Sequence, residues 1–379
     1  MNKILSYFIV LVLSAGFLIV GNQVATFNAE SLSGNQNNEF APTFYNARIT
    51  EILENTVERI ELSHGYMTNI TVVFTAHITG GERRGQEVLA RYFHTDFLAL
   101  PTIPLSVGNR VVLFYDDWDS EFQFVELIRT HFIIILALLF LALMLFFGRI
   151  KGINAVISLV FIYMAIFFVF IPAILNERNI YITTIIVSAY AILSTLLIVI
   201  GVNKKALSAI IGCLGGVMFA GFLVAIMNGI MHLSGVIDSD TRTLMQFNAN
   251  INFRALIFAG VIIGAVGAIM DVAMSISSSL WELNESGGVS DFKSIFKSGI
   301  NIGRDVIGTM LNTLILAYIG SSISLILLLM MHYTSFMELL NMEMIVVELL
   351  RALVGSMGML IAVPLTAAVC GWFYTKPMK

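Results

Sequence analysis

Charged residues are scarce in this 379-residue chain: they make up 12% of it, about half the share typical of a soluble domain. The formal net charge is only −4, and the longest basic runs are the pairs Arg83-Arg84 and Lys204-Lys205, so no nucleic-acid-binding patch is indicated. Hydrophobic residues reach 58%, and the mean hydropathy is +0.87. These values exclude a soluble globular protein and predict a polytopic α-helical membrane protein, whose first partner is the lipid bilayer.

Cysteines and catalytic signatures are also sparse. Cys213 and Cys370 are the two cysteines, and both lie in apolar runs without CxxC spacing. This predicts small buried side chains rather than a disulfide or a metal site. The sequence has no HExxH, GxSxG, P-loop or GxGxxG in a suitable context, so no cofactor is expected and an enzyme is the less favoured class. Whether a metal binds stays open at this level.

The N-terminal third divides into three parts. Residues 1–21 contain the apolar run "ILSYFIVLVLSAGFLIV" but no clean small-x-small cleavage site follows, which favours an uncleaved transmembrane anchor over a signal peptide. Residues 22–42 are polar and are typical of a flexible linker. Residues 43–130 contain five short β-like runs separated by turn signals such as "TGGERRG", which predicts a small all-β domain, either a barrel or a sandwich, with an OB-like barrel favoured.

Residues 131–379 form the predicted membrane domain. It holds seven apolar segments, each close to or above the ~20 residues needed to cross ~30 Å of hydrocarbon. Their bounds are 131–148, 152–175, 180–201, 206–232, 254–281, 305–331 and 344–374. The last contains Pro364, so it is expected to tilt, kink or divide. With the N-terminal anchor, the sequence predicts about eight transmembrane helices.

Basic residues in the connecting segments predict the orientation. One side carries three, namely Arg178, Arg242 and Arg254. The other carries ten, namely Lys3, Arg149, Lys151, Lys204, Lys205, Lys293, Lys297, Arg304, Lys376 and Lys379. The richer side is expected to be cytoplasmic, which places both termini inside and residues 22–130 outside a bacterial cytoplasmic membrane.

Two consecutive segments contain most of the intramembrane polar residues. An ionised side chain costs about 2.5–3.5 kcal/mol at mid-bilayer, so such residues are rare there and usually form pairs or line a cavity. At helical spacing one face of the first segment carries Asp271, Ser275, Ser278, Ser279 and Glu282, and one face of the second carries Asn301, Asp305, Gly308 and Asn312, flanked by Arg304 and Thr309. A short connection predicts that the two helices are antiparallel neighbours with facing stripes. Close helix packing is expected at Gly260, Gly264, Gly267 and Gly308.

The stretches "IGAVGAIMDVAMSISSSLWEL" (263–283) and "SGINIGRDVIGTMLNTLILAYIG" (298–320) resemble the YibE/F-like family of bacterial membrane proteins. Weaker agreement extends to the N-terminal anchor, the "VGNRVVLFY" strand and "KKALSAIIGCLGG". The resemblance implies a multi-pass protein of the bacterial cytoplasmic membrane. It carries over no catalytic residues.

Three functions are compatible with the polar stripes. The first is a small-solute transporter or permease, coupled to protons or a cation, in which Asp271, Arg304 and Asp305 serve the pathway because the stripes carry excess negative charge. The second is a non-catalytic scaffold or sensor, whose β domain binds an extracytoplasmic protein. The third is an intramembrane hydrolase using Asp271 and Asp305 as paired carboxylates. A homo-oligomer is compatible with each of them. An all-structural explanation, in which the stripes are ion pairs and packing contacts, also stays open. Glu348 and Arg351, at i, i+3, are predicted to form an intrahelical ion pair.

Overall fold

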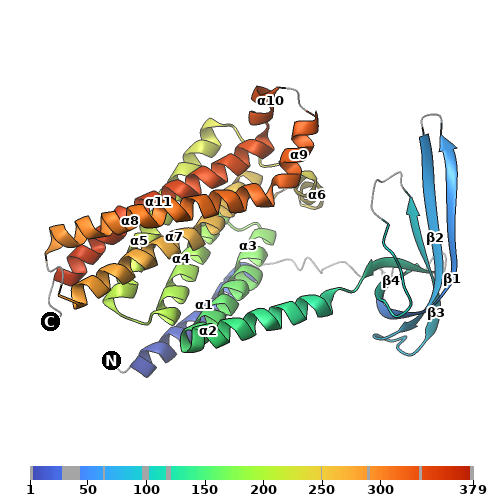
Figure 1. The fold of residues 1–379 in the computed structure, drawn as a ribbon, viewed down its shortest axis with the longest axis horizontal. Coiled ribbons are helices and arrows are strands. Elements are labelled where there is room, and N and C mark those ends of the chain that lie inside the picture. The colour runs from blue at the N-terminus through green and yellow to red at the C-terminus, as the bar shows by residue number, and fades with distance from the viewer. Residues whose placement is uncertain are drawn as a thin grey trace. The chain divides into compact units, whose positions relative to one another are not determined.

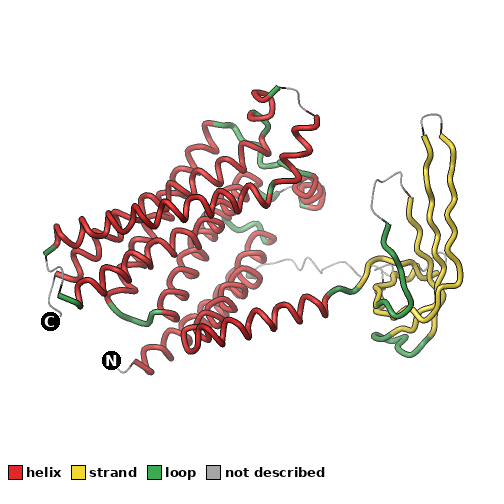
Figure 2. Tube along the Cα trace, viewed as in Figure 1, coloured by secondary structure: helices red, strands yellow, loops and turns green. Residues whose placement is uncertain are grey.

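The structure is a computed structural model that describes residues 3–27, 43–62, 65–95, 102–116, 121–248, 250–287, 291–332 and 335–375. Most of the predicted linker (28–42), together with Lys376 and Lys379, lies outside the described residues. Close contacts divide the chain into two compact units, one formed by residues 1–29 and 145–379 and the other by residues 30–144. The strands belong to the second unit, which also includes the start of a helix at Thr130, whereas the described part of the first unit consists of helices joined by loops (Figure 2).

The β unit is a closed five-stranded barrel, as its turn-separated runs indicated. Its strands are β1 (Thr43–Leu62), β2 (Gly65–Ile78), β3 (Glu87–Thr95), β4 (Arg110–Asp116) and β5 (Glu121–Leu127), in the order β1-β2-β3-β5-β4. Alternate residues of each strand point inward, such as Tyr45, Ala47 and Ile49 of β1, because successive side chains of a strand lie on opposite faces. A short parallel pairing of Ala90 with Phe122 joins β3 to β5 and closes the barrel.

The first half of the helical unit begins with α1 (Lys3–Thr26), many of whose apolar side chains are exposed. It is followed by α2 (Thr130–Ala165), a π-helical turn η2 (Ile166–Phe170), α3 (Ile171–Leu175) and α4 (Ile180–Val199). The backbone leaves helical geometry inside α2 at Arg149, with φ 48° and ψ −130°, where the sequence predicted a loop between two spans. The π-helical turn precedes Pro172, whose ring and missing N–H disfavour a regular helix at that point.

The second half contains the long core helices α5 (Lys204–Ile230), α7 (Phe253–Glu285), α8 (Phe292–Ser321) and α11 (Glu343–Thr375). Shorter helices α6 (Ser239–Phe247), α9 (Ile323–His332) and α10 (Phe336–Leu340) connect them. The four long helices lie side by side, and α11 packs on each of the other three (Figure 1). Pro364 does not divide α11, which is a single helix.

Helices α4, α5, α7 and α8 each begin after a residue whose side chain caps the helix. Asn179, Asn203, Asn252 and Asp291 accept hydrogen bonds from the first-turn backbone N–H groups of α4, α5, α7 and α8. These caps satisfy amide groups that have no partner within the helix. Hydrogen bonds from Ser294 hold the pKa of the Asp291 carboxyl below its usual value, so this charged cap persists as the pH falls and is lost only in acid.

Seven described helices are long and apolar enough to cross a membrane when Thr130–Leu175 is counted as one element. The helix that contains the apolar segment predicted to start at residue 305 begins earlier, because α8 starts at Phe292. Its first turns alternate buried Ile295 and Gly299 with exposed polar residues, so an apolar run does not mark them although the helix is continuous. The predicted single segment 305–331 is instead divided between α8 and α9.

Small residues set the spacing at the centre of the bundle. A Cβ atom placed on Gly216 of α5 would lie 2.7 Å from the backbone oxygen of Gly358 on α11. Cys213 and Cys370, one on each of these helices, are both free thiols and buried, as predicted. Lipid tails are as apolar as the helices, so close packing of this kind is a main source of association between them.

Gly216→Ala is therefore expected to destabilise the bundle. Overpacking costs about 1–3 kcal/mol, which exceeds the gain of about 1 kcal/mol that alanine brings to a helix. The measurement is thermal unfolding of the purified protein in detergent. The matched control is Gly229→Ala on the same helix, where a new Cβ meets no atom within 4 Å. Equal melting temperatures for the two variants would contradict the close-packing account.

Candidate functional site

The polar stripe of α7 lies on the outer face of the helix core. Asp271 and Glu282 are exposed and Ser275 is half-buried, whereas Ile269, Ile276 and Leu280, which lie on the opposite face, are buried. Gly260, Gly264 and Gly267 continue the same face toward the start of the helix. One face of α7 is thus lined by carboxylates, hydroxyls and glycines over most of its length, and it is free of large apolar side chains at these positions.

Ser277 was not among the predicted site residues, and it is the serine of this segment with a structural role. Its hydroxyl donates to the backbone oxygen of Lys205 at 2.7 Å and lies 3.0 Å from the Tyr374 hydroxyl. It is completely buried. These contacts join the end of α7 to the start of α5 and the end of α11. The sequence indicates this role only through the position of Ser277 beside the exposed stripe rather than on it.

The polar stripe of α8 lies on the side of that helix away from the bundle. All the predicted residues are exposed, namely Asn301, Arg304, Asp305, Gly308, Thr309 and Asn312. The opposite side packs inward through Ile295, Gly299 and Gly303. A Cβ on Gly299 would lie 2.6 Å from the Cβ of Ala367, so these glycines seat α8 against α11 and fix its rotation. The expectation that the two stripes face one another within the chain is therefore wrong.

The four ionisable groups of the stripes are not paired. Among the residues that the structure describes, no hydrogen bond or ion pair involves the side chain of Asp271, Glu282, Arg304 or Asp305. A carboxylate dyad that shares a proton needs its members within hydrogen-bond reach. Asp305 projects from the side of α8 away from the bundle. The paired carboxylates that the hydrolase alternative needs are therefore not formed by Asp271 and Asp305 of one chain.

A second polar cluster lies at the other end of the α7 glycine stripe. Glu348 and Arg351 of α11 form an ion pair of 2.7 Å, as their spacing predicted, with side chains only 21% and 25% exposed. The guanidinium lies over Gly260, where a Cβ would approach Nη2 at 3.5 Å. The Tyr318 hydroxyl of α8 lies over Gly264, 2.9 Å from the corresponding position. We call Tyr318, Glu348 and Arg351 the outer cluster.

Polar atoms of the outer cluster remain without partners. Glu348 Oε2, Arg351 Nε and the Tyr318 hydroxyl are buried and make no hydrogen bond with any described residue. Buried polar atoms without partners are uncommon and point to bound water, an ion or a ligand. The sequence indicated the ion pair but not its environment, because Tyr318 and the glycines come from other helices. Gly260 and Gly264 thus accommodate two polar side chains rather than a helix backbone, and a Cβ on Gly267 would meet no atom within 4 Å.

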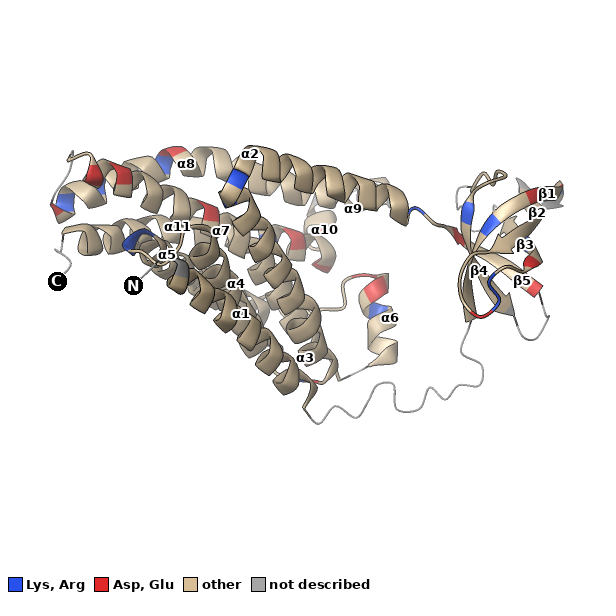
Figure 3. Cartoon of the chain, turned by 90° about the horizontal axis from the view of Figure 1, so that it is seen from below, with Lys and Arg blue, Asp and Glu red and all other residues tan. Residues whose placement is uncertain are grey.

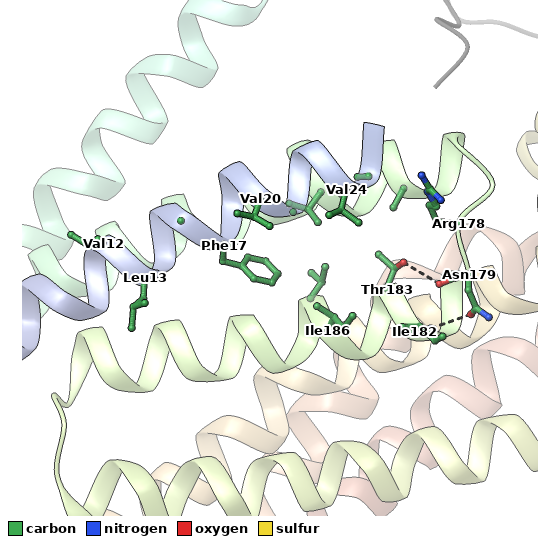
Figure 4. Close-up of a pocket in the computed structure, with 16 residues that line it drawn as sticks. Val12, Leu13, Phe17, Val20, Val24, Arg178, Asn179, Ile182, Thr183 and Ile186 are labelled. Atoms are coloured by element: carbon green, nitrogen blue, oxygen red, sulfur yellow. Dashed lines mark hydrogen bonds between the residues drawn. The ribbon is translucent and has the colours of Figure 1, made fainter. Parts of the chain in front are cut away.

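Two larger grooves are found among the described residues. The first has a volume of about 720 Å³ and lies between α1 and the α3–α4 region; it is lined by aliphatic side chains and Phe17, with Arg178, Asn179 and Thr183 at one end (Figure 4). Such a lining suits hydrocarbon rather than hydrated ions. The second, about 760 Å³, lies between α5 and α11, and its Glu343 is already occupied by hydrogen bonds from Ser234 and Gly235.

Charged side chains are few along the helices of the bundle (Figure 3). Among the described residues, no three or more His, Cys, Asp or Glu side chains cluster closely enough to hold a metal ion. The α7 stripe and the outer cluster are therefore the candidate site: an open polar face that leads to buried polar groups near the start of α7.

The chain matches the YibE/F-like protein family over residues 136–376, and it belongs to that family. The matched region includes both stripes and the outer cluster. No curated protein and no solved structure shows a significant match to the chain. Family membership and the long apolar helices together identify a membrane-embedded helical protein.

Breaking the outer ion pair should destabilise the protein. Arg351→Met alone leaves a mostly buried carboxylate unpaired, and such losses cost up to about 3–5 kcal/mol. The double variant Glu348→Leu/Arg351→Met removes both charges and is expected to regain most of the melting temperature. Arg129→Met is the matched control, since it breaks an i, i+3 pair of 2.9 Å that is half exposed and worth under about 1 kcal/mol. A single variant as stable as this control would contradict the assignment.

Proposed function

We propose that this member of the YibE/F-like family is a permease for a small solute, coupled to the movement of protons or a cation along the exposed face of α7. The observation that carries the proposal is the composition of that face. The carboxylates of Asp271 and Glu282 are unpaired, and serines and glycines lie between the ionisable groups. The α7 stripe ends at the outer cluster. Intramembrane ionisable groups of this kind mark ion and substrate pathways.

The charges of the α7 face favour a cation. Asp271 and Glu282 bring two negative charges, and no basic side chain neutralises them in the described structure. The outer cluster is neutral in sum, because Glu348 and Arg351 compensate one another. A cation or proton that enters from the Glu282 end would therefore first be attracted by the two carboxylates of α7. It would reach the Glu348–Arg351 ion pair last. Gly267 leaves room for a hydrated species, because a Cβ on it would meet no atom within 4 Å.

Neutralising Asp271 tests the pathway directly. Asp271→Asn is expected to lower flux at least tenfold while membrane abundance and melting temperature stay unchanged. The measurement uses proteoliposomes at an imposed membrane potential, with protons followed by an internal pH-sensitive dye, and K⁺ and Mn²⁺ as further probes. Asp291→Asn is the matched control, because it neutralises an exposed carboxylate but retains an effective helix cap.

The same assay separates a pathway from a scaffold. Glu348→Leu/Arg351→Met should fold but conduct poorly if the outer cluster belongs to the pathway. Wild-type flux in both Asp271→Asn and this double variant would overturn the permease proposal. No flux of any probe through the wild-type protein would favour the scaffold, whose β barrel then becomes the part to test for partner binding.

The orientation of the chain is a separate proposal. We place the α4–α5 connection, the α7–α8 connection and both termini on the cytoplasmic side of a bacterial cytoplasmic membrane, and the β barrel outside. In support, the start of α5 and the end of α11 lie together, since Lys204 Nζ donates to the backbone oxygen of Phe373 at 2.9 Å. The basic residues Lys204 and Lys205 belong to this end.

Site-specific labelling tests this orientation. A membrane-impermeant maleimide should label Ser286→Cys, beyond the end of α7, only after the cells are opened. It should label Gly80→Cys, in a turn of the β barrel, in intact cells. Both positions are in turns of the described chain, and Cys213 and Cys370 are buried and provide an unlabelled background. The reverse pattern of labelling would invert the proposed topology.

A further inference from the structure

The exposed stripe of α8 is incompatible with a helix that faces lipid. Asn301, Arg304, Asp305 and Asn312 are directed away from the bundle. They lie on a helix long and apolar enough to span the bilayer. Hydrocarbon offers no hydrogen-bond partner, and each ionised side chain in it costs about 2.5–3.5 kcal/mol. The part of this face that lies within the membrane therefore requires another polar surface to cover it.

Among the residues that the structure describes, no other segment of the chain covers this face. The other span with almost no packing is the first half of α2, residues 130–148. After Thr130 and His131 its residues up to Phe147 are all apolar, so their side chains cannot accept or donate a hydrogen bond. A second copy of the chain does present matching groups, because it carries the same stripe.

We propose that the α8 stripe is the contact face between two copies of this protein, related by a two-fold axis normal to the membrane. Both copies have the same orientation in the bilayer, so their α8 helices run parallel and equivalent residues meet at equal depth. Arg304 then pairs with Asp305 of the partner subunit, and the reciprocal pair forms across the axis. The amide of Asn312 hydrogen-bonds its counterpart further along the helix.

The local geometry suits this arrangement. Arg304 and Asp305 are adjacent in sequence and point about 100° apart on the helix, so they do not face each other within one chain. Paired across a two-fold axis, their charges cancel. Gly308 lies between them and Asn312, and a Cβ on it would meet no atom within 4 Å of its own chain. The missing side chain lets two parallel helices approach closely at that point.

Disulfide cross-linking in membranes tests the contact. Gly308→Cys is expected to form a covalent dimer on mild oxidation, since the two introduced thiols meet at the axis. The matched control is Met218→Cys on α5, which is 69% exposed on another face of the bundle and should stay monomeric. The native Cys213 and Cys370 are buried and do not contribute. A monomeric Gly308→Cys protein would overturn the proposal.

A charge exchange identifies the ion pairs. Arg304→Asp alone and Asp305→Arg alone place like charges together at the axis, and each should weaken dimerisation at least tenfold in detergent or nanodiscs. The variant with both substitutions restores opposite charges and should recover the dimer. Because Ile295, Gly299 and Gly303 are untouched, all three variants keep the packing of α8 on α11.

A third experiment tests whether α2 of the same chain, rather than a second copy, covers the α8 stripe. Gly308→Cys is combined with a cysteine introduced at Leu139, in the apolar half of α2. A cross-link inside one chain, with no dimer formed, would show that α2 covers the stripe and would overturn the proposal. Dimerisation that is unaffected by either single charge substitution would do the same. The outcome is independent of whether the protein transports anything.

Discussion

The structure depends on one constraint: hydrocarbon cannot satisfy a hydrogen bond. Every polar group within the bilayer must find its partner in protein, in water or in a bound species. In the α5–α7–α11 core the backbone groups are paired within the helices. Side-chain hydroxyls donate to nearby backbone oxygens, as Thr366 Oγ1 does to the Ala362 oxygen at 2.7 Å. The described chain leaves polar groups without partners at three places: at Asp271, along the α8 stripe and in the outer cluster. These are the surfaces where water, an ion, a solute or another protein surface would bind.

Glycine decides which surfaces are closed and which stay open. Gly216 and Gly358 bring α5 and α11 into backbone contact, and Gly299 and Gly303 seat α8 on α11. Gly260 and Gly264 instead accommodate Arg351 and Tyr318, two polar side chains from neighbouring helices. The same residue type therefore builds a dry core in one place and a polar niche in another, and the difference lies in what the neighbouring helix places opposite it.

The outer cluster and the α8 stripe have different consequences for function. The cluster is enclosed, charge-balanced and partly unsatisfied, so it suits the end of a route for a small polar species. The stripe is open and carries adjacent opposite charges, so it suits contact with an identical stripe. One is a candidate pathway of a single chain and the other a candidate interface between two, and the two roles share no residue.

Composition and periodicity alone determined the membrane class, a small domain of five strands, the two buried cysteines and the Glu348–Arg351 pair, because each depends on local spacing or on bulk hydrophobicity. The α7 and α8 stripes could also be read from the sequence, since helical spacing places their members on one face. The relative direction of the two stripes could not be read from it, because the rotation of α8 is set by the packing of Gly299 and Gly303 against Ala367 and Val363, which lie 60 or more positions away. The parallel β3–β5 closure and the placement of Tyr318 beside Arg351 likewise arise from contacts between distant segments, which only the tertiary structure decided.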